Sequence, residues 1–158
     1  MIASASPATT TTLATSTRFA AVRDRLEHFP LSIIQLAMRV GVGGIFFNAG
    51  LIKYRSWEFT VQLFRDEYQV PLFAPEAAAR VAMVQELTLP ILLFAGLATR
   101  LATVPFLGML AVIQIFVYPN AWAEHLVWGS ILLFILTRGP GVFSLDHAIA
   151  RWASARRS

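Results

Sequence analysis

The sequence places an arginine and a glutamate inside long apolar stretches, where each charge would need a partner. Arg39 lies within the stretch 31–52, and Glu86 lies within the stretch 79–97. Ionised side chains at membrane depth are costly, so they are usually paired or functional. The sequence therefore predicts an intramembrane charge pair between Arg39 and Glu86. Such a pair would either serve a site or only neutralise both charges and fix the register of the helices.

A second set of polar side chains lies toward one end of the apolar stretches. It consists of Asn48, Gln114, His125 and Trp128. If these side chains converge with Glu86, they would combine amides, a carboxylate, an imidazole suited to proton transfer and an aromatic wall. Such a pocket would suit the carbonyl oxygens and ring of a quinone or another small amphipathic molecule. The alternative is that the amides only hydrogen-bond between helices and the aromatic residues form an interfacial belt.

Several kinds of chemistry are not expected from these residues. The sequence contains no cysteine, which excludes disulfides, thiolate metal sites, iron–sulfur clusters and cysteine nucleophiles. His28 and His147 fall outside the apolar stretches and are expected at the surface rather than as metal ligands. The glycine-rich run 41–44 lies inside an apolar stretch, so it indicates helix packing and not nucleotide binding. We expect no metal, no haem and no nucleotide cofactor.

The composition indicates that these side chains are embedded in a membrane. Of the 158 residues, 56% are hydrophobic and 14% are charged, whereas soluble domains carry about 25% charged residues. The net charge of +4 does not indicate nucleic-acid binding, because the basic residues flank apolar runs. The expected fold is all-α, a four-transmembrane-helix bundle with short amphipathic surface helices. The expected spans are residues 31–52, 79–97, 101–118 and 122–137.

Two segments outside the spans have the pattern of amphipathic helices. Between Lys53 and Arg80, hydrophobic residues recur at helical spacing and predict a helix that lies on the bilayer or caps the bundle. An ordinary folded loop is the alternative. Near the end of the chain, Ser144 is expected to cap a surface helix. The hydrophobic residues that recur at helical spacing between Lys53 and Arg80 are Trp57, Val61, Phe64 and Tyr68.

The distribution of basic residues predicts the orientation in a bacterial inner membrane. Basic residues are enriched on the cytoplasmic side, and more of them lie on the side of the two termini. That side carries Arg18, Arg23, Arg25, Arg100, Arg138, Arg151, Arg156 and Arg157, and the opposite side carries Lys53, Arg55, Arg65 and Arg80. Both termini are therefore expected in the cytoplasm. The expected regions are a tail over 1–29 that is disordered over 1–17, a transmembrane domain over 30–140, and a cytoplasmic amphipathic segment over 141–158.

The sequence resembles the DoxX family of small four-helix membrane proteins over residues 31–150. The resemblance rests on the order and spacing of short motifs. These are residues 39–53 with Trp57, Glu86-Leu87 with Pro90, residues 96–100, residues 139–141 and residues 144–146. Residues 67–72 and 112–119 are similar to the branch of the family encoded beside copper-binding bufferin-type peptides.

The resemblance implies a quinone-linked membrane role, because the family takes its name from a subunit of a thiosulfate:quinone oxidoreductase. It implies a site at Arg39, Asn48, Lys53, Glu86 and His125. Lys53, Trp57 and Tyr118 are expected at its rim. A protein partner would supply any thiol step. A scaffold that anchors a partner through residues 53–80, and a small-molecule or peptide exporter, are the alternatives. Self-association of two copies of the chain through the glycine-rich first span is a further alternative.

Overall fold

The computed structural model describes residues 20–71 and 73–157, and these residues form helices and connecting turns without a β-strand. The chain divides into two units, residues 1–31 and residues 32–158. In the first unit, residues 20–27 are helical and exposed. The disordered tail expected over 1–17 lies outside the described residues.

Among the described residues, three helices are long and apolar enough to cross a membrane: Leu31–Arg55, Pro75–Ala95 and Thr99–Val117. They correspond to α2 (Leu31–Arg55), α4 (Pro75–Ala95) and α5 (Thr99–Val112) with its π-helical extension η2 (Ile113–Val117). The predicted all-helical membrane protein is therefore confirmed. The fourth expected span forms helix α6 (Trp122–Arg138). Its 17 residues measure about 25 Å, less than the roughly 30 Å apolar thickness of a bilayer.

The helix boundaries follow from local chemistry. Helix α4 starts at Pro75, before the expected residue 79, because proline is well tolerated in the first turn, where an amide hydrogen would have no partner. It ends before Gly96, which has a left-handed φ of 66°. Helix α2 continues to Arg55, three residues beyond the expected boundary at 52. Pro90 and Pro105 lie inside α4 and α5.

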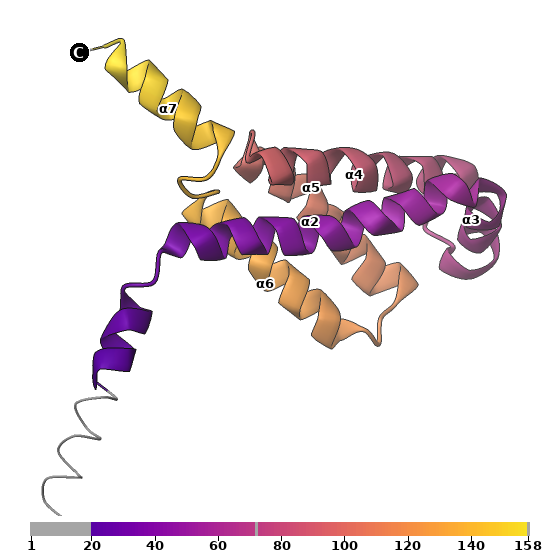
Figure 1. Ribbon diagram of the computed structural model, residues 1–158. Helices are drawn as coiled ribbons and strands as arrows, with labels where there is room; N and C mark the ends of the chain where they lie inside the picture. Colours follow the sequence, from indigo (N-terminus) through magenta and orange to yellow (C-terminus); the bar gives the residue numbers. More distant parts are fainter. Residues whose placement is uncertain (1–19, 72, 158) are drawn as a thin grey trace, which may run out of the picture. The chain divides into compact units, whose positions relative to one another are not determined.

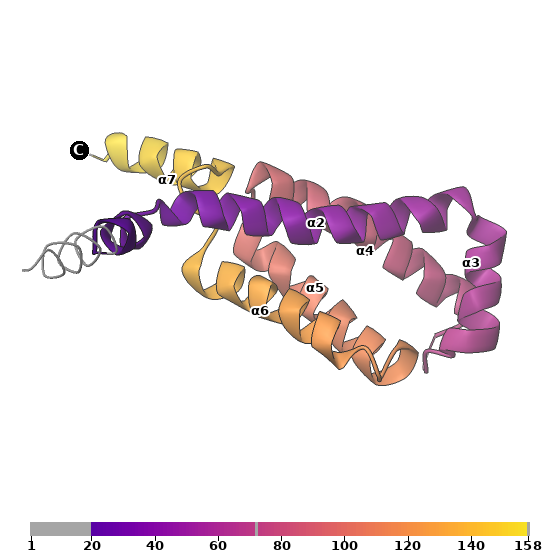
Figure 2. The ribbon, with the colours of Figure 1, turned by 60° about the horizontal axis from the view of Figure 1, so that its bottom comes forward.

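Side chains from α2, α4, α5 and α6 form one apolar core. Figures 1 and 2 show these helices packed along one another, and α5 contacts both α4 and α6. At the centre, the Phe46 and Phe106 rings lie 4.9 Å apart. The buried core residues are Val42, Phe46, Leu93, Phe106, Met109, Leu110, Leu132 and Ile135.

The predicted amphipathic segment after α2 is helical, so the loop alternative is wrong. It forms α3 (Trp57–Leu63) and the π-helical turn η1 (Phe64–Tyr68). Its apolar stripe packs on the first turns of α4, where Ala78 and Ala79 are buried. Figure 2 shows α3 crossing the end of α2. The segment therefore caps the helices at this end.

The C-terminal helix α7 (Leu145–Ala155) is also present. The Ser144 hydroxyl accepts a hydrogen bond from the amide of His147 at 3.2 Å, which confirms the predicted N-cap. Along α7, Leu145, Ile149 and Trp152 remain 47–58% exposed. This helix therefore buries little of its apolar face against the rest of the described chain.

Candidate functional site

Glu86 pairs with Lys53, and the predicted pair between Arg39 and Glu86 is not formed. The Lys53 ammonium donates a hydrogen bond to Oε1 of Glu86 at 2.8 Å and lies 2.8 Å from Oε2. Gly50, one turn before Lys53, allows the close approach, because a Cβ there would lie 2.9 Å from Cβ of Glu86. On α2, Arg39 precedes Lys53 by about 21 Å at 1.5 Å per residue. Lys53 is therefore the cation on α2 that reaches Glu86.

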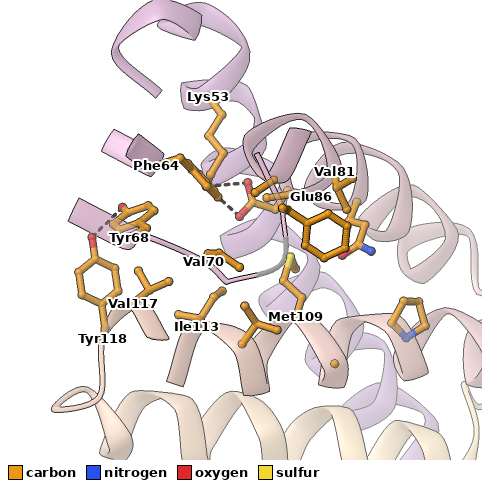
Figure 3. Close-up of a pocket in the computed structure, with 17 residues that line it drawn as sticks. Lys53, Phe64, Tyr68, Val70, Val81, Glu86, Met109, Ile113, Val117 and Tyr118 are labelled. Carbon is orange, nitrogen blue, oxygen red and sulfur yellow. Dashed lines mark hydrogen bonds and ion pairs between the residues drawn. The ribbon is translucent and has the colours of Figure 1, made fainter. Parts of the chain in front are cut away.

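The ion pair lies beside an apolar cavity of about 420 Å³. We call this cavity the Lys53 pocket. Figure 3 shows Lys53 and Glu86 on one side, the Phe64 and Tyr68 rings beside them, and Met109 and Ile113 across the cavity. The Glu86 side chain is 4% exposed and that of Lys53 is 18% exposed. The two charges are therefore largely removed from solvent and are available to a molecule in the cavity.

Two π-helical turns shape one end of the Lys53 pocket. In η1 the amide of Gln69 donates to the carbonyl of Phe64, and in η2 the amide of Tyr118 donates to that of Ile113. The hydroxyls of Tyr68 and Tyr118 lie 2.8 Å apart, in hydrogen-bonding distance (Figure 3). Each of these turns closes the C-terminal end of its helix, where π-turns occur. Here they place two phenol groups at the pocket.

Burial, and then the hydrogen bond with Tyr118, raise the pKa of Tyr68 above its ordinary value. Its phenol therefore remains protonated at neutral pH. One phenol of the Tyr68–Tyr118 pair donates to the other. The second phenol is then free to donate to an oxygen acceptor in the pocket.

The Lys53 pocket opens between α4 and α5. Val81 is 50% exposed and Val112 is 38% exposed, and both line the cavity. A Cβ on Gly108, which also lines it, would meet nothing within 4 Å among the described atoms. Both helices are long and apolar enough to cross a membrane. An opening between two such helices would give a lipid-soluble molecule access to the cavity.

Gln114, His125 and Trp128 form a separate cluster. Nδ1 of His125 lies 2.6 Å from Oε1 of Gln114, and Nε2 of Gln114 donates to the carbonyl of Pro119 at 2.8 Å. The rings of His125 and Trp128 lie 5.5 Å apart. None of these three side chains lines the Lys53 pocket. The cluster joins η2 to the first turn of α6. This is the hydrogen bonding between helices that the sequence left as an alternative.

Two other predicted residues are also outside the cavity. Asn48 is exposed on α2, and within residues 20–71 and 73–157 its side chain forms no hydrogen bond or ion pair. Trp57 packs in the stripe against α4, with the Arg80 guanidinium 5.7 Å from its ring centre. The predicted convergence of the other polar residues on Glu86 is therefore not formed. Of the expected rim residues, Lys53 and Tyr118 line the cavity. Tyr68 and Gln85 complete the polar lining.

Tyr68 was recognised as part of a packing stripe, but not as a pocket residue. Its partner Tyr118 is 50 residues away in the sequence, so no local spacing relates the two. Gln85 lies next to Glu86 within the apolar stretch 79–97. A polar side chain at this position is a sequence feature that could have identified it as a pocket residue.

Arg39 lies in a different environment, which we call the Arg39 cluster: Arg39, Gly96, Phe143 and Asp146. Arg39 is fully buried, and its Nη2 donates to the carbonyl of Phe143. A Cβ on Gly96 would collide with Nη1 of Arg39 and would lie 2.8 Å from Cα of Ser144. The guanidinium thus ties α2 to the segment before α7.

The carboxylate of Asp146 completes the Arg39 cluster. It accepts hydrogen bonds from the amides of Ala98 at 2.7 Å and Thr99 at 2.9 Å. The amide of Asp146 donates in return to the carbonyl of Gly96 at 2.9 Å. Residues 96–100 and 144–146, two of the motifs in the family resemblance, therefore contact each other. Their contacts are those of a structural junction.

No group of three or more histidine, aspartate and glutamate side chains among the described residues could hold a metal ion. The sequence model of the family described as DoxX matches residues 34–119. No curated protein and no solved structure matches the chain. The matched segment contains Lys53, Glu86 and Tyr118.

Proposed function

This chain belongs to the DoxX family, and on that premise we propose that the Lys53 pocket binds the headgroup of a quinone. The observation that carries the proposal is the Lys53–Glu86 ion pair beside an apolar cavity that opens between two membrane-spanning helices. An apolar cavity with a few convergent polar groups is the usual form of a small-molecule site. Its volume of about 420 Å³ lies in the usual range for such sites.

The polar groups of the pocket match the chemistry of a quinone. A quinone carries carbonyl oxygens that only accept hydrogen bonds. The Lys53 ammonium and one phenol of the Tyr68–Tyr118 pair are donors. The Glu86 carboxylate can accept a hydrogen bond from the hydroxyl of the reduced form. The Phe64 ring lines the cavity and offers an aromatic surface. The isoprenoid tail leaves between α4 and α5, where Val81 and Val112 are exposed.

The protein crosses the bacterial inner membrane four times, with α6 as the fourth span and both termini in the cytoplasm. The support is the enrichment of basic residues on the side of the termini. It is also the shared apolar core, to which α6 contributes Leu132 and Ile135. The Lys53 pocket then lies toward the opposite face of the membrane. The chain acts as a quinone-binding subunit of an oxidoreductase system, and a protein partner delivers the electrons.

The direct test is to purify the protein in mild detergent, extract it with organic solvent and quantify bound quinone by mass spectrometry. Gly108→Leu fills the cavity without removing a charge, and Gly44→Leu adds the same side chain at another open position of a spanning helix. We expect a stoichiometric quinone in the wild type and in Gly44→Leu, and a large loss in Gly108→Leu. Absence of quinone from the wild type, or equal amounts in both variants, contradicts the proposal.

The exposed acidic face of α3 and η1 favours a second candidate, a membrane scaffold that anchors a partner protein. Glu58, Asp66 and Glu67 are exposed and, within the described residues, form no ion pair. Replacing all three by glutamine should release a co-purifying partner if the protein is a scaffold. If the partner is retained by this variant, the acidic face is not its binding surface.

A further inference from the structure

A second hollow lies where α5 begins, α6 ends and α7 begins. It has a volume of about 690 Å³ and shares no lining residue with the Lys53 pocket. We call it the Arg100 hollow. The residues that matter for its chemistry are Gln35, Arg100, Arg138, Gly139, Asp146 and His147.

The hollow presents two arginines whose charges are not neutralised. Neither Arg100 nor Arg138 has a carboxylate within ion-pair distance in the part of the chain that the structure describes. Arg100 makes one long contact, 3.4 Å, from Nη2 to the carbonyl of Thr137. The one carboxylate of the hollow, Asp146, already accepts two backbone amides. The hollow is therefore basic and has free guanidinium donors.

The backbone at Gly139 keeps the Arg100 guanidinium accessible. Gly139 has a φ of 82°, and a Cβ there would lie 3.3 Å from Nη2 of Arg100. A side chain at this position would crowd the guanidinium and strain the backbone. The glycine thus leaves space beside the charge.

The hollow lies at the start of α5, the end of α6 and the start of α7. If α5 and α6 cross a membrane, this end of the two helices is at the level of the lipid headgroups. On α7, Leu145, Ile149 and Trp152 are exposed, and the Arg156 guanidinium lies 3.6 Å from the centre of the Trp152 ring. An exposed apolar stripe with neighbouring arginines is the pattern of a helix that lies in the interface of an anionic membrane.

We propose that the Arg100 hollow binds the phosphate group of an anionic phospholipid. Arginine forms paired hydrogen bonds to phosphate oxygens, and two guanidinium groups can contact one phosphate from two helices. The acyl chains of the lipid extend along α5 and α6. This site is independent of quinone binding and lies at the other end of the helices.

Native mass spectrometry of the full chain in mild detergent tests this site. The probes are phosphatidylglycerol, phosphatidylcholine and inorganic phosphate, titrated separately into delipidated protein. The test variant is Arg100→Gln with Arg138→Gln. The control is Arg55→Gln with Arg65→Gln, which removes the same charge from two exposed positions at the other end of the helices.

We expect one phosphatidylglycerol bound by the wild type and the control, and affinity about tenfold or more weaker in the test variant, since each arginine near an anionic lipid contributes about 1 kcal/mol. Equal weakening in the control, or equal affinity of the wild type for phosphatidylcholine, overturns the proposal. Inorganic phosphate that competes at millimolar concentration would show a free-phosphate site and overturn the lipid assignment. If the test variant aggregates, Arg100→Lys with Arg138→Lys replaces it, and unchanged affinity in that variant overturns the role of paired guanidinium contacts.

Discussion

Glu86 and Arg39 are both charged and almost completely buried on helices that can cross a membrane, yet their surroundings differ. Glu86 borders a cavity of about 420 Å³ and pairs with Lys53. Arg39 is enclosed by the segment before α7 and by Gly96, where even a Cβ would collide with it. Free volume beside the charge, and not burial of the charge, therefore distinguishes a candidate site from a structural junction.

The largest loss of stability is expected for Gly96→Ala, which disrupts the packing of the Arg39 cluster. A left-handed φ and a collision with Arg39 and with Cα of Ser144 should lower the free energy of unfolding by about 4 kcal/mol. The measurement is denaturant unfolding in mild detergent, with Gly44→Ala as the control at an open position. Quinone content per folded protein should not change. A loss of quinone in folded Gly96→Ala would mean that the two ends are coupled.

Glu86→Gln should destabilise the protein by about 3 kcal/mol, because it leaves a buried lysine without its counter-charge. The magnitude is at the lower end for buried pairs because the Lys53 side chain is 18% exposed. The double variant Glu86→Leu with Lys53→Met should recover most of the stability but bind no quinone. Recovery of quinone binding by the double variant would show that the ion pair only fixes the helices.

Asp146→Asn should cost about 2 kcal/mol, because one of two charge-assisted hydrogen bonds to backbone amides is lost. Those bonds are the ones to Ala98 and Thr99. Quinone content should again be unchanged, which distinguishes the Arg39 cluster from the Lys53 pocket. Glu124→Gln, an exposed substitution on α6, is the control, and equal destabilisation by both would remove the structural role of Asp146.

The smallest effect is expected for Tyr68→Phe, about 1 kcal/mol from the lost bond between the two hydroxyls. The pKa of Tyr68 is raised in the folded protein, so the folded state holds the phenol proton more tightly than the unfolded chain does. This stabilisation is complete below the unfolded pKa of about 10 and is lost as the pH rises above it.

Tyr68→Phe should therefore weaken the decline in the unfolding midpoint between about pH 10 and pH 12. The exposed Tyr54→Phe, on α2, should leave the decline as in the wild type. Parallel declines in the wild type and both variants would exclude Tyr68 as the titrating group.

Local patterns were sufficient for the helices and insufficient for the site. The stripe through Trp57 and Val61 identified α3, and Ser144 identified the start of α7, because both signals depend on residues within a few positions of one another. Which cation of α2 pairs with Glu86 depends on the relative depth of α2 and α4. That depth is set by contacts such as Gly50 against Glu86, which no local spacing reveals.

The sequence by itself determined that the chain is helical and membrane-embedded, because composition and helical periodicity are properties of consecutive residues. It also identified Glu86 as a charge that needs a partner. Only the tertiary structure decided that the partner is Lys53, that Gln114 and His125 bond to each other, and that Tyr68 reaches Tyr118. The physical reason is that a buried charge or hydroxyl is stabilised by whichever group the packing of the helices brings within hydrogen-bonding distance.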